Sequence, residues 1–254
     1  MPIETAFVAL ASFLAGLVDS IVGGGGLVLV PALFATFPTT APATLLGTNK
    51  CASVWGTAVA ARQFARRVEL GWSWLIPAAG VALVGAMTGA WALTQVDASF
   101  LRRVLPFLLL VVLLYTLANK RLGMTHAPSR SPRATLAIGC AVAFVIGWYD
   151  GFFGPGAGSF FIFALVRLLG FDFLHASASA KVLNVATNAA ALALLAARGH
   201  VWWQVGAVLA VANVAGSLLG ARLALQHGAG LVRRVFVGVV SVLILKTAYD
   251  AFLR

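Results

Sequence analysis

Long apolar stretches, separated by short polar segments, run along the whole chain. They lie at residues 6–35, 42–64, 72–94, 102–119, 135–166, 173–197, 202–224 and 232–253. Each is near or above the roughly 20 residues that an α-helix needs to cross a bilayer. In lipid the backbone must satisfy its own hydrogen bonds, which a helix does within one segment. The pattern therefore predicts an all-α polytopic membrane protein.

The composition supports this prediction, and it changes how the net positive charge of the chain is interpreted. Hydrophobic residues make up 61% of the 254-residue chain and charged residues only 10%. Soluble domains have about 45–50% apolar and about 25% charged residues. A net charge of +11 would suggest nucleic-acid binding in a soluble protein. Here most lysines and arginines lie in the short polar segments, as the positive-inside rule predicts. We expect a lipid bilayer around the chain and no nucleic acid partner.

The chain matches itself when it is shifted by 131 positions. The shift superimposes different residue types in one register: Asp19 on Asp150, Gly23 on Gly154, Gly25 on Gly156, Lys50 on Lys181 and Trp72 on Trp203. Chance would not keep acids, lysines and glycines aligned over this length. We interpret residues 1–118 and 134–254 as two homologous transmembrane repeats and the polar stretch 119–133 as their linker.

The distribution of basic residues indicates how the repeats are oriented. If every apolar segment crosses once, nine lysines and arginines share the linker side and six lie opposite. If the long first segment of each repeat dips in and returns at its glycines, the repeats are inverted and the split becomes eleven to four. The positive-inside rule favours the inverted arrangement, with three transmembrane helices after each re-entrant segment and a cytoplasmic linker. The length of the first segment suits two half-helices joined at a loop, and a long tilted helix is the alternative.

Both repeats interrupt their first apolar segment with glycines, in "DSIVGGGGLVLVP" at 19–31 and "DGFFGPGAGSFFI" at 150–162. Glycine costs a helix about 1 kcal/mol relative to alanine, and proline cannot continue a helix interior. A helix that restarts after such a break presents free N–H groups and a positive dipole end, which together bind anions. Close helix packing is the alternative, and it suits Gly85/Gly89 and Gly216/Gly220 better. The predicted loop residues are Gly23, Gly24, Gly25, Gly26, Gly154, Pro155, Gly156 and Gly158.

Two lysines lie at equivalent positions in the second apolar segments. Lys50 and Lys181 are each a few residues inside the segment. A lysine within the membrane costs about 2.5–3.5 kcal/mol on insertion scales, so its repetition indicates a use. Either the two cations face the glycine loops and attract a substrate anion, or they form structural ion pairs with Asp19 and Asp150 or snorkel to the interface. These roles can coexist, and the sequence leaves them open.

Asp19 and Asp150 are the only acids well inside the apolar segments. Desolvation and a nearby lysine act on a carboxyl group in opposite directions, so either aspartate can carry a coupling proton. We favour a structural role, in which they balance the lysines or cap the broken helices. Asparagines complete the candidate substrate site: Asn49 next to Lys50, and Asn184 and Asn188 on one helical face with Lys181.

No catalytic chemistry is visible in the sequence. Cys51 and Cys140 are far apart and lack metal-ligand spacing, so we expect buried, inert thiols. His175 and His200 lie near segment ends, where we expect them to be hydrated. There is no Ser–His–Asp set, metal-ligand cluster or P-loop. We therefore expect no catalytic residues, metal or cofactor, no enzyme activity and no ATP-driven mechanism within this chain.

Three motifs carry a resemblance to a known family: "TLLGTNKCAS" at 44–53, "DGFFGPGAGSF" at 150–160 and "SAKVLNVATN" at 179–188. With the duplicated layout, the chain resembles the TauE/SafE family of sulfite and organosulfonate transporters, in particular its YfcA-type branch. The resemblance covers nearly the whole chain. It implies a multi-pass permease of the bacterial inner membrane that moves small sulfur-containing anions, with export as the expected direction. Many members have Ser–Leu where this chain has Asn49–Lys50 and Ala180–Lys181, so this chain adds two cations to the site.

The leading hypothesis is a secondary transporter whose anion site lies between two inverted repeats and opens alternately to either side. Its expected partners are a small anionic substrate, the lipid bilayer, protons as coupling ion and further copies of the chain in a homo-oligomer. A passive anion channel and a transporter of a non-sulfur carboxylate are alternatives. A non-transporting subunit that scaffolds an enzyme is a further alternative, and the lack of a long soluble domain counts against it.

Overall fold

A computed structural model describes residues 2–95 and 124–252 of the protein. The regular elements in these ranges are α-helices: α1 (Pro2–Val22), α2 (Gly26–Thr36), α3 (Pro42–Ala65), α4 (Trp72–Leu93), α6 (Pro132–Phe152), α7 (Ala157–Leu169), α8 (Phe173–Ala197) and α9 (Trp203–Phe252). Five stretches are long and apolar enough to span a membrane: Glu4–Val22, Trp72–Leu93, Pro132–Phe152, Phe173–Ala197 and Trp203–Gly238. The prediction of an all-α membrane protein is confirmed for the described residues. The predicted segment 102–119 and the first part of the linker lie outside them.

The glycine clusters break the first apolar segment of each half. The break between α1 and α2 covers residues 23–25, and the break between α6 and α7 covers residues 153–156. Glycines take positive φ angles there, for example +68° at Gly23 and +92° at Gly154, which side-chain-bearing residues avoid. Each first segment thus forms two helices joined at a glycine loop, but the two arms are unequal in length. The first arms, α1 and α6, have 21 residues each, or about 31 Å at the rise of an α-helix. Only α2 and α7 are short, because the glycines follow a full span of apolar sequence instead of dividing it in the middle.

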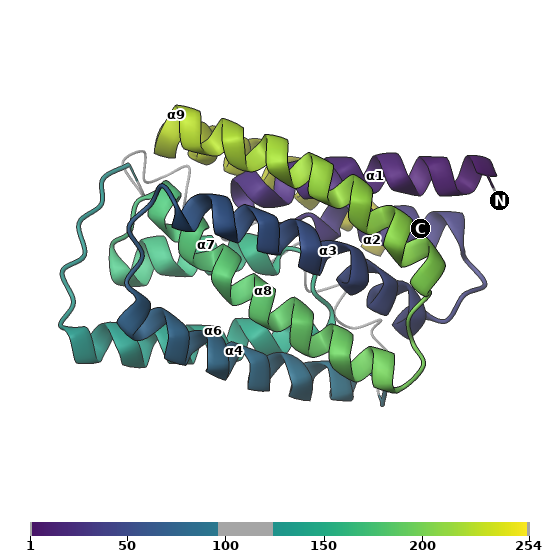
Figure 1. Cartoon of the computed structure of the whole chain (residues 1–254), viewed down its shortest axis with the longest axis horizontal. Helices are drawn as coiled ribbons and strands as arrows, with labels where there is room; N and C mark the ends of the chain where they lie inside the picture. The colour runs from purple at the N-terminus through teal and green to yellow at the C-terminus, as the bar shows by residue number, and fades with distance from the viewer. Residues whose placement is uncertain (1, 96–123, 253–254) are drawn as a thin grey trace.

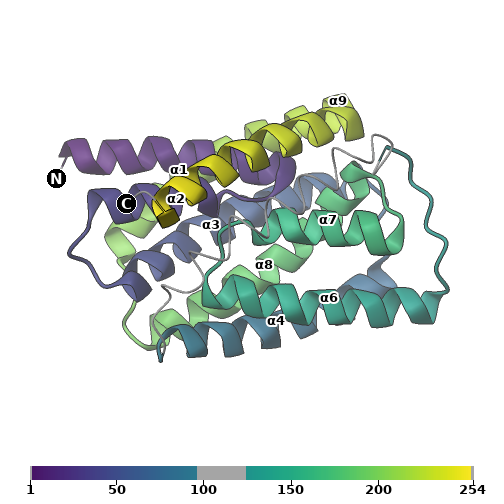
Figure 2. The ribbon, with the colours of Figure 1, turned by 180° about the vertical axis from the view of Figure 1, so that it is seen from behind.

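The second arm of each broken segment turns back beside the first (Figures 1 and 2). α2 packs on α1 in a cluster that contains Val8 and Ala11 of α1 and Leu33 of α2. A continuous helix would hold these residues far apart. α7 lies beside α6 in the same way, and α1 and α6 run in opposite directions along the long axis of the molecule (Figure 1). The two broken segments therefore enter the bundle from opposite ends.

Small residues let helices from the two halves pack at backbone contact. A Cβ atom at Gly85 of α4 would overlap the carbonyl oxygen of Phe144 in α6. A Cβ atom at Gly216 of α9 would overlap the carbonyl oxygen of Phe13 in α1. The glycine four positions further along each helix makes the matching contact one turn on. The close-packing interpretation of these four glycines is confirmed, and the two sets of contacts are related by the 131-residue shift.

α9 combines two of the predicted segments, 202–224 and 232–253. The chain turns back at Gly228, whose φ of 67° and ψ of −163° are not helical (Figure 1). This turn lies at the same end of the molecule as the loop 66–71, the segment 124–131 and the loop 170–172, whereas the loop 198–202 lies at the other end. Described arginines gather in or beside the connections of the first end: Arg62, Arg66, Arg67, Arg130, Arg133, Arg167, Arg222, Arg233 and Arg234. One end of the bundle is therefore strongly basic.

Candidate functional site

The two breaks meet in the interior of the bundle. A Cβ atom at Gly23 would overlap the backbone of Gly158, and a Cβ atom at Gly158 would overlap that of Gly23. Ser159, in the first turn of α7, donates a hydrogen bond from Oγ to the carbonyl oxygen of Gly23 at 2.5 Å. On another side, a Cβ atom at Gly26 would lie 3.4 Å from Cα of Pro155. The fold thus brings together the glycine loops of the two halves.

Asp19 holds the first break through both carboxylate oxygens. Its Oδ1 accepts hydrogen bonds from the N–H groups of Gly24 at 3.1 Å and Gly25 at 3.3 Å, directly before α2. Its Oδ2 accepts hydrogen bonds from Lys181 Nζ at 3.1 Å and Thr57 Oγ1 at 3.4 Å. Asp19 therefore occupies backbone donors of the break as well as pairing with a lysine, which corresponds to the structural role favoured from the sequence.

Asp150, the equivalent acid of the second half, makes fewer bonds. Its Oδ1 accepts a hydrogen bond from Lys50 Nζ at 2.7 Å. Its Oδ2 is buried, and no donor among the described residues reaches it. The N-cap residue of α7, Gly156, has a φ of 86°, and no described side chain caps this helix. The two acids thus differ, because Asp150 keeps one carboxylate oxygen available and Asp19 does not.

Each lysine bonds the aspartate of the other half of the chain. Lys50 of α3 pairs with Asp150 of α6, and Lys181 of α8 pairs with Asp19 of α1. Lys181 also donates from Nζ to the backbone carbonyl of Asp19. The lysines are 3% and 0% exposed, so neither snorkels to an interface. Buried charges are tolerated when they are paired and hydrogen-bonded, so these crossed pairs connect the two halves at the breaks.

A small cavity of about 30 Å³ lies between the breaks and the lysine-bearing helices. It has room for about one or two waters, which is less than an anion of four or more heavy atoms needs. The site must therefore widen to take up such an anion. Ten of the fifteen predicted site residues line the cavity: Asp19, Gly24, Gly26, Asn49, Lys50, Asp150, Gly154, Gly158, Asn184 and Asn188.

Five predicted residues lie around the cavity without lining it, namely Gly23, Gly25, Pro155, Gly156 and Lys181. The glycines and the proline form the backbone of the breaks, and Lys181 pairs with Asp19, which lines the cavity.

Three hydroxyl side chains in or around the site were not among the predicted site residues. Ser53 lines the cavity, Thr57 bonds Asp19 and Ser159 bonds the opposite break. Ser53 and Thr57 follow Lys50 by three and seven positions, which puts them on the same face of α3, and this spacing was the available signal.

The cavity presents acceptors as well as a cation. In the described part of the chain, two buried lining atoms lack a hydrogen-bond partner, Oδ1 of Asn49 and Oδ2 of Asp150. Lys50 and Asp150 both line the cavity, and this pair is neutral as a unit. A ligand that satisfies all three groups has an anionic oxygen for Lys50 and a proton for an acceptor.

Comparison with known proteins identifies relatives of the chain. The family model described as "Sulfite exporter TauE/SafE" matches residues 8–247. The chain is 40% identical over 243 residues to "Probable membrane transporter protein YfcA" of Escherichia coli (strain K12), covering 94% of this chain and 88% of that protein. It is 36% identical over 246 residues to "Probable membrane transporter protein ORF9" of Sinorhizobium sp, covering 96% and 92%. It is 37% identical over 241 residues to a "Probable membrane transporter protein" of Haemophilus influenzae, covering 94% and 92%.

No solved structure gives a significant match to the chain. The family match extends over nearly the whole sequence, and it confirms the resemblance carried by the three motifs. The helices of membrane-spanning length fit the names of the relatives. The chain therefore belongs to the TauE/SafE family of membrane transporters.

Proposed function

We propose that the chain is a secondary transporter, not an enzyme, that moves small sulfur-containing anions such as sulfite or organosulfonates out of the cell across the bacterial inner membrane. The observation that carries the proposal is the set of buried lysine–aspartate pairs around a cavity where two broken helices meet. Charged side chains within membrane segments are costly and mark substrate or ion pathways. The family description, sulfite exporter, supports the class of substrate and the direction.

The transport mechanism that we propose uses two inverted repeats, 1–118 and 134–254. The opposite directions of α1 and α6 support this arrangement (Figure 1). So do the glycine contacts related by the 131-residue shift and the lysine–aspartate pairs that cross between halves. The basic end of the bundle faces the cytoplasm by the positive-inside rule. Alternating access then widens the cavity to one side at a time by movement of one broken segment against the other.

Charge balance assigns a role to the open oxygen of Asp150. The two buried lysines and the aspartates that pair with them are neutral together, so an incoming anion adds an uncompensated charge at a low-dielectric site. A proton on Asp150 removes one negative charge and releases Lys50 to the anion. Asp19 is bonded through both oxygens and stays structural. The proton and the anion therefore cross together, with Asp150 as the proton carrier, and the outward concentration gradient of the anion drives export against the inward proton gradient.

Reconstitution of the purified chain into liposomes tests this function. We expect protein-dependent flux of ³⁵S-labelled sulfite or of a sulfonate, measured without oxygen and with the more acidic solution on the side from which the anion leaves. The rate should fall when a protonophore collapses this pH gradient. A parallel arm uses a labelled carboxylate. Flux that is insensitive to the protonophore supports the channel alternative, and flux of the carboxylate alone supports the non-sulfur alternative. Absence of flux for all of these anions contradicts the proposal.

A further inference from the structure

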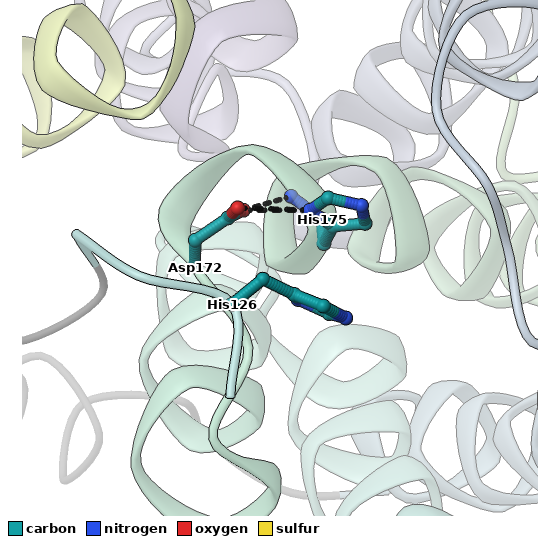
Figure 3. Close-up of side chains that lie close together, drawn as sticks. All are labelled: His126, Asp172 and His175. Carbon is teal, nitrogen blue, oxygen red and sulfur yellow. Dashed lines mark hydrogen bonds and ion pairs between the residues drawn. The ribbon is translucent and has the colours of Figure 1, made fainter. Parts of the chain in front are cut away.

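Outside the cavity, three side chains that can ligate a metal gather at the basic end of the molecule (Figure 3). His126 lies in the segment 124–131, and Asp172 and His175 lie at the start of α8. One ligand atom of each of the three residues lies within 4.8 Å of the others. The sequence predicts no metal-ligand cluster, because 46 positions separate His126 from Asp172. The fold removes that separation.

Asp172 and His175 are fixed by the helix itself. Asp172 is the N-cap of α8, and its Oδ1 accepts a hydrogen bond from the backbone N–H of His175 at 2.7 Å. Nδ1 of His175 lies 2.9 Å from each carboxylate oxygen. Zinc bonds to nitrogen and oxygen are about 2.0–2.2 Å long, which puts tetrahedral ligand atoms about 3.4 Å apart, so a bound ion would replace this direct contact and move the two atoms slightly apart. Oδ1 serves the cap, and Oδ2 remains for a metal.

The cap does not account for His126, which comes from the segment between the halves. Its ring stacks on that of His175, with centroids 3.9 Å apart and planes at 28°. The segment is anchored there, since the N–H of Ala127 donates to the carbonyl oxygen of Gly170 at 2.9 Å. The exposed ring of His126 can rotate on this fixed backbone. Rotation of the ring would bring a nitrogen of His126 closer to the ligand atoms of Asp172 and His175. Ligand atoms of a tetrahedral zinc ion lie about 3.4 Å from one another.

We propose that His126, Asp172 and His175 bind one divalent transition-metal ion of the zinc type, with water completing the coordination. Imidazole suits zinc, copper, nickel and iron, and two histidines with one carboxylate form a known zinc-ligand set, whereas calcium and magnesium prefer oxygen ligands alone. The ion joins the segment 124–131 to α8, the helix that carries Lys181. It thereby holds the connection between the halves against a helix of the transport site, and it lies apart from the cavity.

Zinc binding to the full-length protein in detergent tests the site, with any histidine tag removed and bound metal stripped by chelation. We expect one Zn²⁺ per chain by calorimetry, and visible absorption of a Co²⁺-loaded sample typical of nitrogen and oxygen ligands. His126→Ala and His175→Ala should each weaken Zn²⁺ binding at least tenfold. Asp172→Ser keeps a cap acceptor and removes the carboxylate, so it should also weaken binding while α8 stays folded by circular dichroism.

His200→Ala and His227→Ala are the matched controls, because these histidines lie outside the cluster. They should bind Zn²⁺ as the wild type does. Unchanged Zn²⁺ affinity in His126→Ala, equal losses in the controls, or absence of Zn²⁺ binding by the wild type would each overturn the proposal. Anion flux in liposomes is a separate readout, so failure of the metal site leaves the transport proposal standing.

Discussion

Replacing Lys50 by methionine should destabilise the protein more than the same change at Lys181. Lys50 is the one described hydrogen-bond partner of Asp150. The side chains of this pair are 4% and 6% exposed. The Lys50→Met variant therefore leaves a buried carboxylate without a donor. Breaking a buried ion pair in this way costs about 3–5 kcal/mol of the free energy of unfolding.

Lys181→Met should cost less, because Asp19 keeps other hydrogen-bond donors. Its carboxylate keeps the N–H donors of Gly24 and Gly25 and the hydroxyl of Thr57. The Asp19 side chain is also 17% exposed. We expect the loss of one charged hydrogen-bond partner, about 1.5–3 kcal/mol. Methionine has nearly the length of lysine, so the two variants differ mainly in what they leave around the aspartate.

Denaturant titration in detergent, followed by tryptophan fluorescence, measures both losses. The double variant Lys50→Met/Asp150→Leu should recover most of the stability, because replacing a buried ion pair by apolar side chains is often neutral or better. Equal losses in the two single lysine variants would refute the reasoning from the unequal bonding of Asp19 and Asp150. Failure of the double variant to recover would show that Lys50 contributes through packing and not through its partner.

Three further predictions follow from the same contacts. Gly158→Ala places a Cβ atom against the backbone of the facing break, so it should lower the free energy of unfolding by about 1–3 kcal/mol and reduce sulfite flux in liposomes. Gly89→Ala should cost a similar amount in denaturant titration because its Cβ overlaps a carbonyl oxygen of α6, whereas Gly80→Ala on the same helix meets no atom within 4 Å and should be neutral or stabilising. Asp150→Asn should make sulfite flux independent of an imposed pH gradient, and Asp19→Asn should instead reduce the yield of folded protein; the opposite result would exchange the two roles.

The sequence predicts the helices and the breaks well because both depend on local properties. Apolar length determines which stretches can span a bilayer, and consecutive glycines interrupt a helix whatever surrounds it. The unequal lengths of the two arms were not predicted, because a glycine cluster marks where a helix stops and not how deep it lies. The close packing at Gly85 and Gly216 was also predictable, since small residues spaced by four are typical of tight helix contacts.

The sequence alone does not predict the contacts between segments that are distant along the chain. The 131-residue shift aligns Lys50 with Lys181 and Asp19 with Asp150, but it does not say which lysine reaches which aspartate. The crossed pairing depends on how the two halves interlock in three dimensions. The unequal bonding of the two acids likewise depends on Thr57, whose partner lies 38 positions away. His126 reaches the start of α8 only through the path of its segment.

Sulfite flux through the charge-balanced double variant tests the central claim most directly. Lys50→Met/Asp150→Leu removes the cation and the open carboxylate of the cavity together and leaves no unpaired charge. Liposomes with this variant are compared with liposomes that hold equal amounts of the wild type and of Gly80→Ala. We predict that the variant folds, elutes as the wild type does and moves labelled sulfite at less than a tenth of the wild-type rate. Wild-type flux through the folded double variant would contradict the assignment of this cavity as the transport site.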